Sequence, residues 1–514
     1  MKPRGTLTGL VLAAVFLAFL ALYAGTAQQD ANWQDSGVRQ WRALTGDYAG
    51  VEGIALAHPL YIGLARGFLR LCPVGTPLFR LNLFSGVGMA AALVVLALLV
   101  QRLTGNLRAA VGAAILLGLA HMAWWQATLT QVYTWSLALF LLEVLLLQAL
   151  LAAPSARRLV VLALVSGLGL AVHDLALLSL PVDAVVAVLL FRRGRLSGRA
   201  LGWSALAFAA GSAPFFALVV REALLQHSLA AAMSSALFGN IYAPQVLGIW
   251  TDMIPRYAMP NLCLFLLNFA SPCWLLAGVG LWVARGRLAP SFRICLVVLT
   301  MAHALFLLRY FIADQSRFAL PTLALLAIWA GVGLAWLLER VDRNRQWLRQ
   351  AILLAGLAVA PAVYWTTWRA LAMGHLAPPR ARELPFRDEA RYWILPWKHD
   401  EHSARRFAES VQEQLEPGAL LFADGTAAGP LLATAAAASR PPQFQLISPY
   451  DLCAPDVVQL ARADPARPFY VVSPTRGYVP EGLLDGSFAF SRTGVLYRVR
   501  LTDVRVRQQS ALPK

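Results

Sequence analysis

The residues best suited to chemistry lie in a polar stretch that follows the first apolar segment of the chain. Asp35–Gly37 opens this stretch, and Ala57–Pro59 lies further along it. Transfer of a sugar from a lipid phosphate needs a base that takes the proton of the attacking hydroxyl. It also needs positively charged groups that hold the departing phosphate. Asp35, just beyond a membrane helix, is therefore a candidate base, and His58 is a candidate to bind the phosphate or to position the base.

Two arginines beside a later apolar segment fit the second need. Arg309 and Arg317 flank a short polar stretch near the membrane surface. Because a guanidinium group binds phosphate oxygens through parallel N–H groups, both arginines are predicted phosphate ligands. For each charged residue of this kind the sequence leaves a simpler alternative open, namely a solvated loop charge or a helix cap.

Other polar residues are placed to line a cavity at this surface. Glu52 belongs to the same polar stretch as Asp35, and His173 and Asp174 lie between two apolar segments. A polar pair at membrane depth is costly in lipid, which favours a cavity, although hydration at a helix end is the alternative. Glu143 and Asp183 fall within apolar runs and raise the same expectation.

Metal and cofactor chemistry find little support in the sequence. His399 and His402 form an HxxH pair, but no third ligand stands in a recognisable setting. The five cysteines include no CxxC pair, and a disulfide between Cys72 and Cys453 is left open. No nucleophile elbow and no P-loop occurs. We expect neither a metal nor another cofactor.

Composition indicates a polytopic membrane protein. Of the 514 residues, 58% are hydrophobic and 14% are charged, whereas soluble domains carry about a quarter charged residues. The net charge of +17 is spread over loops, where orientation rules place it, so no nucleic acid partner is expected. We predict about eleven spans: Leu7–Ala27, Leu81–Val100, Ala109–Gln126, Val132–Ala152, Leu159–Val172, Leu175–Phe191, Leu201–Val220, Leu262–Ala284, Ile294–Leu308, Phe318–Leu338 and Ala351–Ala370.

Lysine and arginine in the loops predict the orientation. Their bias favours a cytoplasmic N-terminus, and an odd number of spans then places the C-terminal tail outside the cytoplasm. The expected domains are a transmembrane domain, 1–370, with a first outer loop, 28–80, and an extracytoplasmic domain, 371–514. Cleavage after Ala27 as a signal peptide is the alternative to an uncleaved first anchor.

The tail is predicted to form a small α/β domain. Its short apolar runs at Ala419–Ala423, Phe444–Ile447, Phe469–Val472 and Val495–Val499 alternate with the helix-like stretches Ser403–Leu415 and Pro455–Ala463. Asp424–Thr426 follows the first predicted strand, at an edge where such sheets often bind ligands. An ordinary turn is the alternative for this tripeptide.

The distributed motifs resemble a known family. The chain is similar to GT-C type membrane glycosyltransferases, and among them to the bacterial protein O-mannosyltransferase-like branch long catalogued as a domain of unknown function. The matching motifs cover nearly the whole chain: Asp35–Gly37, Ala57–Pro59, Arg80–Ser85, Trp125–Ala127, Val132-Tyr133, Gly167-Leu168 with His173, Tyr310 with Asp314 and Pro321, Leu384-Pro385, Arg387-Asp388, Pro396–His399, Gly418-Ala419 and Asp424–Thr426. The sequence departs from the family at Val38 and Gln131, where the family has glutamate, and in a shortened run after His58.

The resemblance implies a function. It implies inverting transfer of a hexose such as mannose from a polyprenyl-phosphate sugar on the outer face of the inner (plasma) membrane, without a metal. The acceptor, whether protein, lipid or glycan, is not specified, and the tail is expected to bind it. Through its motifs the resemblance also places Gln131, Tyr133 and Asp314 in the cavity. A transporter or flippase for lipid-linked glycans, or an inactive membrane scaffold, remains the alternative function.

Overall fold

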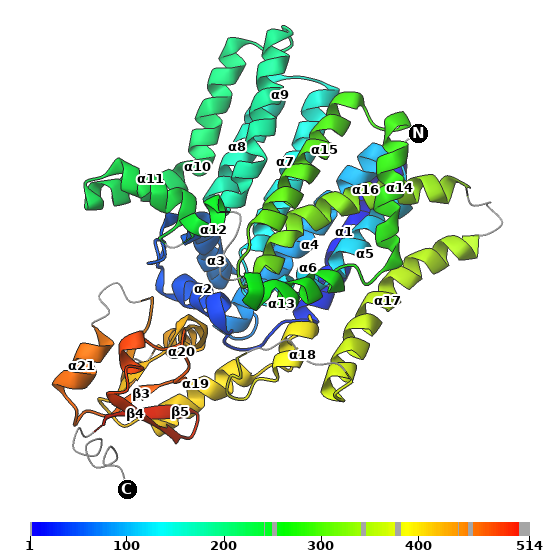
Figure 1. The fold of residues 1–514 in the computed structure, drawn as a ribbon. Coiled ribbons are helices and arrows are strands. Elements are labelled where there is room, and N and C mark those ends of the chain that lie inside the picture. The colour runs from blue at the N-terminus through cyan, green and yellow to red at the C-terminus, as the bar shows by residue number, and fades with distance from the viewer. Residues whose placement is uncertain are drawn as a thin grey trace.

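The fold is a bundle of apolar helices with a small α/β domain at one end (Figure 1). The computed structural model describes residues 3–240, 242–248, 254–340, 346–375, 382–439, 442–450 and 456–502. Cys453 lies outside these residues, so its pairing with Cys72 stays a prediction.

Long apolar helices account for most of the bundle. Six are long and apolar enough on their own to cross a bilayer, and eight if each of two bent pairs is counted as one span. The six lie in α1 (Pro3–Thr26), α4 (Pro77–Thr104), α7 (Tyr133–Ala152), α10 (Gly198–Gln226), α15 (Pro290–Arg309) and α16 (Leu320–Arg340). The protein is a multi-pass membrane protein, and the count of eleven spans stays a prediction.

The remaining predicted spans also correspond to helices, with three departures from a straight rod. Ala109–Gln126 becomes α5 (Leu107–Gly118) and α6 (His121–Ala127), bent by 72°. Leu262–Ala284 becomes α13 (Ile254–Leu267) and, after a 3-10 turn (Pro272–Leu275), α14 (Leu276–Val283), with a 90° bend across the break between Leu267 and Pro272. Pro272 begins the second part, where a proline is tolerated because the N–H that it lacks has no partner in the first turn of a helix. Leu175–Phe191 begins as a 3-10 turn (Asp174–Leu178) and continues as α9 (Leu180–Arg192). The other two are α8 (Ala156–Val172) and α17 (Gln346–Ala372).

The first outer segment is more structured than a polar loop. It folds into α2 (Gln34–Thr45), a 3-10 turn (Ile54–Leu56) and α3 (Pro59–Leu71). Helix α2 ends at Gly46, whose left-handed φ of 82° closes the last turn. A second peripheral helix, α11 (Leu229–Phe238), projects sideways from the bundle, followed by the short α12 (Ala243–Leu247).

The tail forms the predicted α/β domain. Strands β1 (Leu420–Phe422), β2 (Gln445–Ile447) and β3 (Phe469–Val471) are parallel, while β5 (Leu496–Leu501) and the unpredicted β4 (Phe488–Thr493) add an antiparallel edge. The strand order is β2-β1-β3-β5-β4. Its helices are α19 (Ser403–Gln414), α20 (Gly425–Ala438) and α21 (Val457–Ala463), and α18 (Glu389–Ile394) precedes them.

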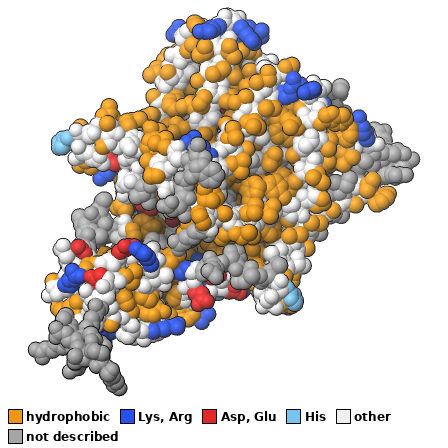
Figure 2. All heavy atoms as spheres, in the orientation of Figure 1, with side chains coloured by type: hydrophobic (Ala, Val, Ile, Leu, Met, Phe, Trp, Pro, Cys, Tyr) orange, Lys and Arg blue, Asp and Glu red, His pale blue; other side chains and the backbone are white. Residues whose placement is uncertain are grey.

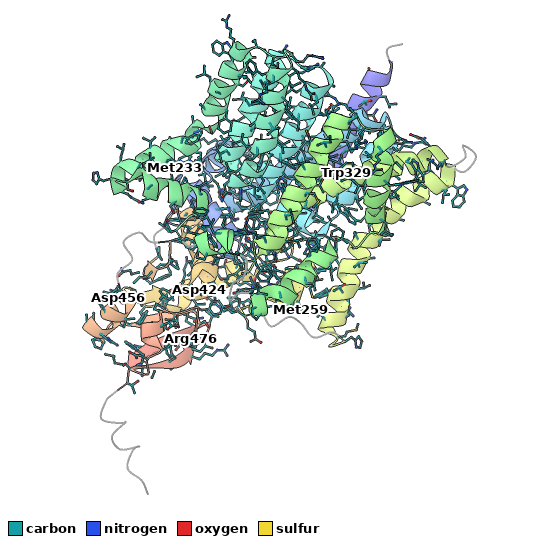
Figure 3. All side chains as sticks on the ribbon, turned by 45° about the horizontal axis from the view of Figure 1, so that its top comes forward. Met233, Met259, Trp329, Asp424, Asp456 and Arg476 are labelled. Atoms are coloured by element: carbon teal, nitrogen blue, oxygen red, sulfur yellow. The ribbon has the colours of Figure 1, made fainter. Side chains whose placement is uncertain are left out.

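The two ends of the molecule differ in surface charge. Apolar side chains cover most of the bundle in Figure 2, and lysine and arginine gather at its upper end, far from the tail. The loop between α9 and α10 carries exposed arginines there: Arg192, Arg193, Arg195 and Arg199. The tail carries charges of both signs. Among its labelled residues in Figure 3, Asp424 lies nearest the bundle.

Candidate active site

A cavity opens between the first outer segment and the bundle, on the side of the tail. It encloses about 1500 Å³, including open space at its mouth. Its lining includes predicted site residues with polar side chains: Asp35, His58, Tyr133, His173, Asp174, Arg309 and Asp314. It also includes apolar side chains, among them Leu177, Leu178, Leu237, Phe238, Leu305 and Phe306. A site of this kind can hold a charged group and a hydrocarbon chain together.

Asp35 lies in the first turn of α2 and faces the cavity. Its side chain is 43% exposed, and its Oδ2 is 3.1 Å from Arg317 Nη1 and 3.9 Å from Arg39 Nη2. The preceding residue, Gln34, has a left-handed φ of 57°. A non-glycine residue in this region is strained by about 1–3 kcal/mol and persists only where the surroundings impose it. The start of α2 is thus held in place by its neighbours.

Arg317 anchors Asp35 from below the cavity. Its side chain is 2% exposed, and Nη1 is also 3.0 Å from Asp314 Oδ2. Its Nη2 donates to Gln34 Oε1 at 3.1 Å, and its guanidinium lies 5.4 Å from the ring centre of Trp125. Because two carboxylates and an amide occupy this group, its direct effect in this structure is to orient Asp35. To bind a phosphate, as the sequence predicts, Arg317 would have to release one or more of these partners.

Arg39 is a site residue that the sequence prediction missed. It follows Asp35 by one helical turn and donates to Gln131 Oε1 at 3.1 Å. Gln131 Nε2 in turn donates to Ser36 Oγ at 2.6 Å. The predicted cavity residue Gln131 therefore lies behind the wall, where it links α2 to the residues before α7. The i, i+4 spacing of Asp35 and Arg39 was the available signal, but it has meaning only if the segment is helical.

Two stacked histidines also line the cavity. The rings of His58 and His173 lie 4.9 Å apart, and His173 Nδ1 is 2.6 Å from Asp174 Oδ1. Burial lowers the pKa of His58 well below its usual range, and His173 lowers it further. A neutral His58 donates its Nδ1–H to the Val172 carbonyl, 3.1 Å away, because a carbonyl can only accept. Its Nε2 is then left with a lone pair, which accepts from a hydroxyl but cannot donate to a phosphate oxygen.

Glu52 lies beside the cavity rather than in its wall. It lines a smaller adjoining pocket with Val38, Arg42 and Tyr450. Burial raises the pKa of the Glu52 carboxyl to about 7, and the negative charge of Asp35 raises it as well. Val38, at the position where the resembled family has glutamate, lines this same pocket. The protein thus keeps a titratable carboxyl in the neighbourhood of Asp35.

Arg309 lies at the rim of the cavity. Its side chain is exposed, and Nη2 donates to the Leu247 carbonyl at 2.7 Å. Within the part of the chain that the structure describes, no carboxylate lies within ion-pair distance of it. Among the arginines near Asp35, Arg309 is therefore the one most available to an incoming anion.

The other predicted elements of chemistry lie elsewhere. Asp424 caps α20 by accepting from Thr426 N–H at 2.9 Å and pairs with Arg382 at 2.7 Å, which supports the turn alternative. His402 pairs with Asp30 at 2.6 Å. Among the described residues no group of three histidine, cysteine or acidic side chains is arranged to hold a metal ion.

Comparison with known proteins supports the predicted resemblance. Residues 57–197 match the model of the protein O-mannosyl-transferase TMEM260 N-terminal domain. This range includes His58, Tyr133 and His173 but not Asp35 or Arg317. No curated protein sequence matches the chain.

Solved structures show the fold. The chain is similar to ArnT from Cupriavidus metallidurans bound to undecaprenyl phosphate, with a TM-score of 0.61, 14% identity and 100% of both chains covered. The apo form of ArnT gives a TM-score of 0.62 at 15% identity, covering 99% of this chain and 100% of that one. The predicted GT-C-like fold and the resemblance to the protein O-mannosyltransferase-like family are confirmed.

Proposed function

We propose that the chain is a membrane glycosyltransferase that moves a sugar from a polyprenyl phosphate to an acceptor hydroxyl. The observation that carries this proposal is the placement of Asp35, paired with Arg317, in a cavity lined by both polar and apolar side chains. The fold shared with ArnT, whose structure contains undecaprenyl phosphate, supports a lipid of that class as the donor.

The polar side chains of the cavity suit a direct displacement of the phosphate by the acceptor hydroxyl. Asp35 takes the proton of the acceptor hydroxyl while the hydroxyl oxygen attacks the anomeric carbon of the donor. The bond from that carbon to the phosphate oxygen breaks, and the phosphate leaves with the electron pair. Attack opposite the leaving group inverts the anomeric configuration. Arg309 at the rim stabilises the departing phosphate, and no metal is needed for that charge.

The remaining wall residues position the two substrates. His58 Nε2 is placed to accept a hydrogen bond from a sugar or acceptor hydroxyl. The leucine and phenylalanine side chains that line the cavity provide an apolar surface for the first isoprene units, since apolar area withdrawn from water stabilises binding. Arg317 and Arg39 keep Asp35 aimed into the cavity.

The orientation follows from charge at the two ends of the bundle. The exposed arginines between α9 and α10 lie at the end opposite the tail (Figures 1 and 2). By the positive-inside rule we infer that this end is cytoplasmic, and that Asp35 and the tail lie on the outer face of the inner membrane. The tail then faces the compartment in which a protein, lipid or glycan acceptor is met.

Transport of a lipid-linked glycan is a second candidate, favoured by one observation. Glu143 and Asp183 are both buried inside the bundle, and Ser166 Oγ donates to Asp183 Oδ2 at 3.0 Å. Buried acidic residues in a membrane often mark a path for ions or protons. Transport would leave the sugar–phosphate bond intact.

Turnover of a labelled donor separates the two candidates. Purified protein in lipid nanodiscs would be incubated with a panel of radiolabelled polyprenyl-phosphate sugars, mannose first, together with a membrane extract as acceptor. A transferase releases free polyprenyl phosphate and labels an acceptor. Retention of an intact donor with every sugar, under conditions where the donor binds, would contradict the transferase proposal.

A further inference from the structure

The tail domain packs against α2, the helix that carries Asp35, on the side away from the cavity. Helices α2 and α20 lie side by side in Figure 1, and Gly37 of α2 meets Gly429 of α20. A Cβ atom on Gly429 would lie 2.5 Å from the Gln34 carbonyl oxygen. A Cβ atom on Gly37 would lie 2.7 Å from the Gly429 carbonyl carbon. Real Cβ atoms do not approach backbone this closely, so neither site admits even a methyl group.

The chain just before α2 is also held by the tail. Trp33 Nε1 donates to Ser403 Oγ at 2.8 Å, and the Trp33 ring packs against Phe407 with ring centres 5.1 Å apart. Asp30 pairs with His402 at 2.6 Å and with Arg405 at 3.4 Å. These contacts join residues more than 300 positions apart, and they hold Asp30 and Trp33, directly before the first turn of α2.

Gln34 connects this contact to the cavity. Its backbone adopts the left-handed φ of 57°, its carbonyl oxygen faces Gly429, and its side chain accepts from Arg317. Asp35 is the next residue and accepts from the same guanidinium. A displacement of Gln34 by the tail would therefore move both the carboxylate and its partner. The cavity walls themselves contain no residue of the tail among those described.

We propose that Gly429 is a positioning residue. Because Gly429 has no side chain, the backbone of α2 packs directly against it, and this contact with the tail domain sets the position of Asp35. This inference rests on the proposed function of Asp35 as base. It assigns the tail a role in the chemical step that is separate from binding the acceptor. The tail then acts on Asp35 through α2 and does not touch the donor.

Kinetics of Gly429→Ala in the full-length protein test the proposal. We expect kcat to fall by at least about tenfold, because a displacement near 1 Å costs about a hundredfold in a positioned reaction. The KM for the lipid donor should stay within about twofold, since the donor cavity is built by other elements. Gly67→Ala in α3 is the matched control, because a Cβ atom there meets nothing within 4 Å. An unchanged kcat in Gly429→Ala would overturn the proposal, as would a loss that appears only in KM.

A second variant covers failure of Gly429→Ala to fold. Trp33→Phe keeps the ring against Phe407 but removes the hydrogen bond to Ser403, which loosens the seat of α2 without adding volume. We expect a several-fold loss of kcat with an unchanged donor KM. Full activity in Trp33→Phe would argue that the tail contacts do not set the position of the base.

A measurement that needs no sugar transfer distinguishes this inference from the function on which it rests. Asp35→Cys would be introduced into a background with the five native cysteines replaced, and the rate of alkylation by a small charged thiol reagent would be followed. The rate should change at least about threefold when Gly429→Ala is added and stay constant when Gly67→Ala is added. Equal rates in all three proteins would refute the positioning role even if the enzyme is active.

Discussion

The buried guanidinium of Arg317 is the feature whose removal should be most informative for stability. Its side chain is 2% exposed and contacts Asp35 at 3.1 Å, Asp314 at 3.0 Å and Gln34 at 3.1 Å. Arg317→Met keeps much of the apolar stem beside Trp125 but removes all three contacts. The two carboxylates then face each other's charge without a cation between them.

The size of the effect follows from burial. Breaking a buried ion pair by removing one partner costs about 3–5 kcal/mol of unfolding free energy, because the other charge stays buried. Asp35 is 43% exposed and Asp314 is 25% exposed, so both recover some solvation from the cavity. We therefore expect the lower end, about 3 kcal/mol. Arg309→Met, at an exposed arginine on the rim, should cost only about 0.5 kcal/mol.

Chemical unfolding in mixed micelles can measure this difference. A double-mutant cycle with Asp314→Asn isolates the pair, and neutralising Asp314 should restore about half of the stability lost in Arg317→Met. A cost in Arg317→Met no larger than in Arg309→Met would refute the view that Arg317 is the anchor of the site. Strict additivity in the cycle would refute the coupling of Arg317 and Asp314.

Two further predictions concern pH. The pKa of Glu52 is raised from 4.5 to about 7, so stability should fall as pH rises through this interval, by about 3 kcal/mol in all. Glu52→Gln should remove this slope from thermal unfolding profiles, and an unchanged slope would contradict the burial of the carboxyl. Burial lowers the pKa of Lys398 from 10.5 to about 7, so stability should rise with pH across that interval, by about 5 kcal/mol. Lys398→Met should flatten the alkaline profile, and a rise that persists would assign it to other groups.

Hydropathy was sufficient to predict most of the bundle. Each apolar run predicted as a span contains at least one helix, because a bilayer-length apolar segment can satisfy its backbone only by coiling. The bend between Leu267 and Pro272 was missed because local hydropathy does not report the direction of a helix. Strands β1, β2, β3 and β5 were found from their apolar runs, whereas β4, which has one apolar face and an exposed end, was not.

The site was predicted by residue type but not by geometry. Asp35, His58 and His173 do line one cavity, as expected from their place beside apolar segments. The helical state of α2 was missed because it is polar, and because one face of it packs against Gly429, a residue distant in the sequence. The same omission hid Arg39, whose pairing with Asp35 exists only on a helix. Burial lowers the pKa of His58, which favours a neutral ring, and its predicted role as a phosphate ligand stays a prediction.

The roles of the site residues and the absence of a metal stay predictions, because the fold alone does not determine which reaction the site catalyses. The departures at Val38 and Gln131 fit this view. Val38 lies beside Glu52, and Gln131 holds Arg39 and Ser36 without a charge. An acidic residue in either place is therefore not needed to retain a carboxyl at the cavity or a link to α2.

The central claim is that Asp35 removes the proton of the acceptor, and transfer by Asp35→Asn tests it most directly. With a labelled polyprenyl-phosphate sugar that the parent protein turns over, the variant should bind the donor but lose activity by at least about a hundredfold. Asp47→Asn is the matched control, since Asp47 lies in the same outer segment and binds only local backbone and Arg42. Transfer by Asp35→Asn at the rate of the parent protein would contradict the account.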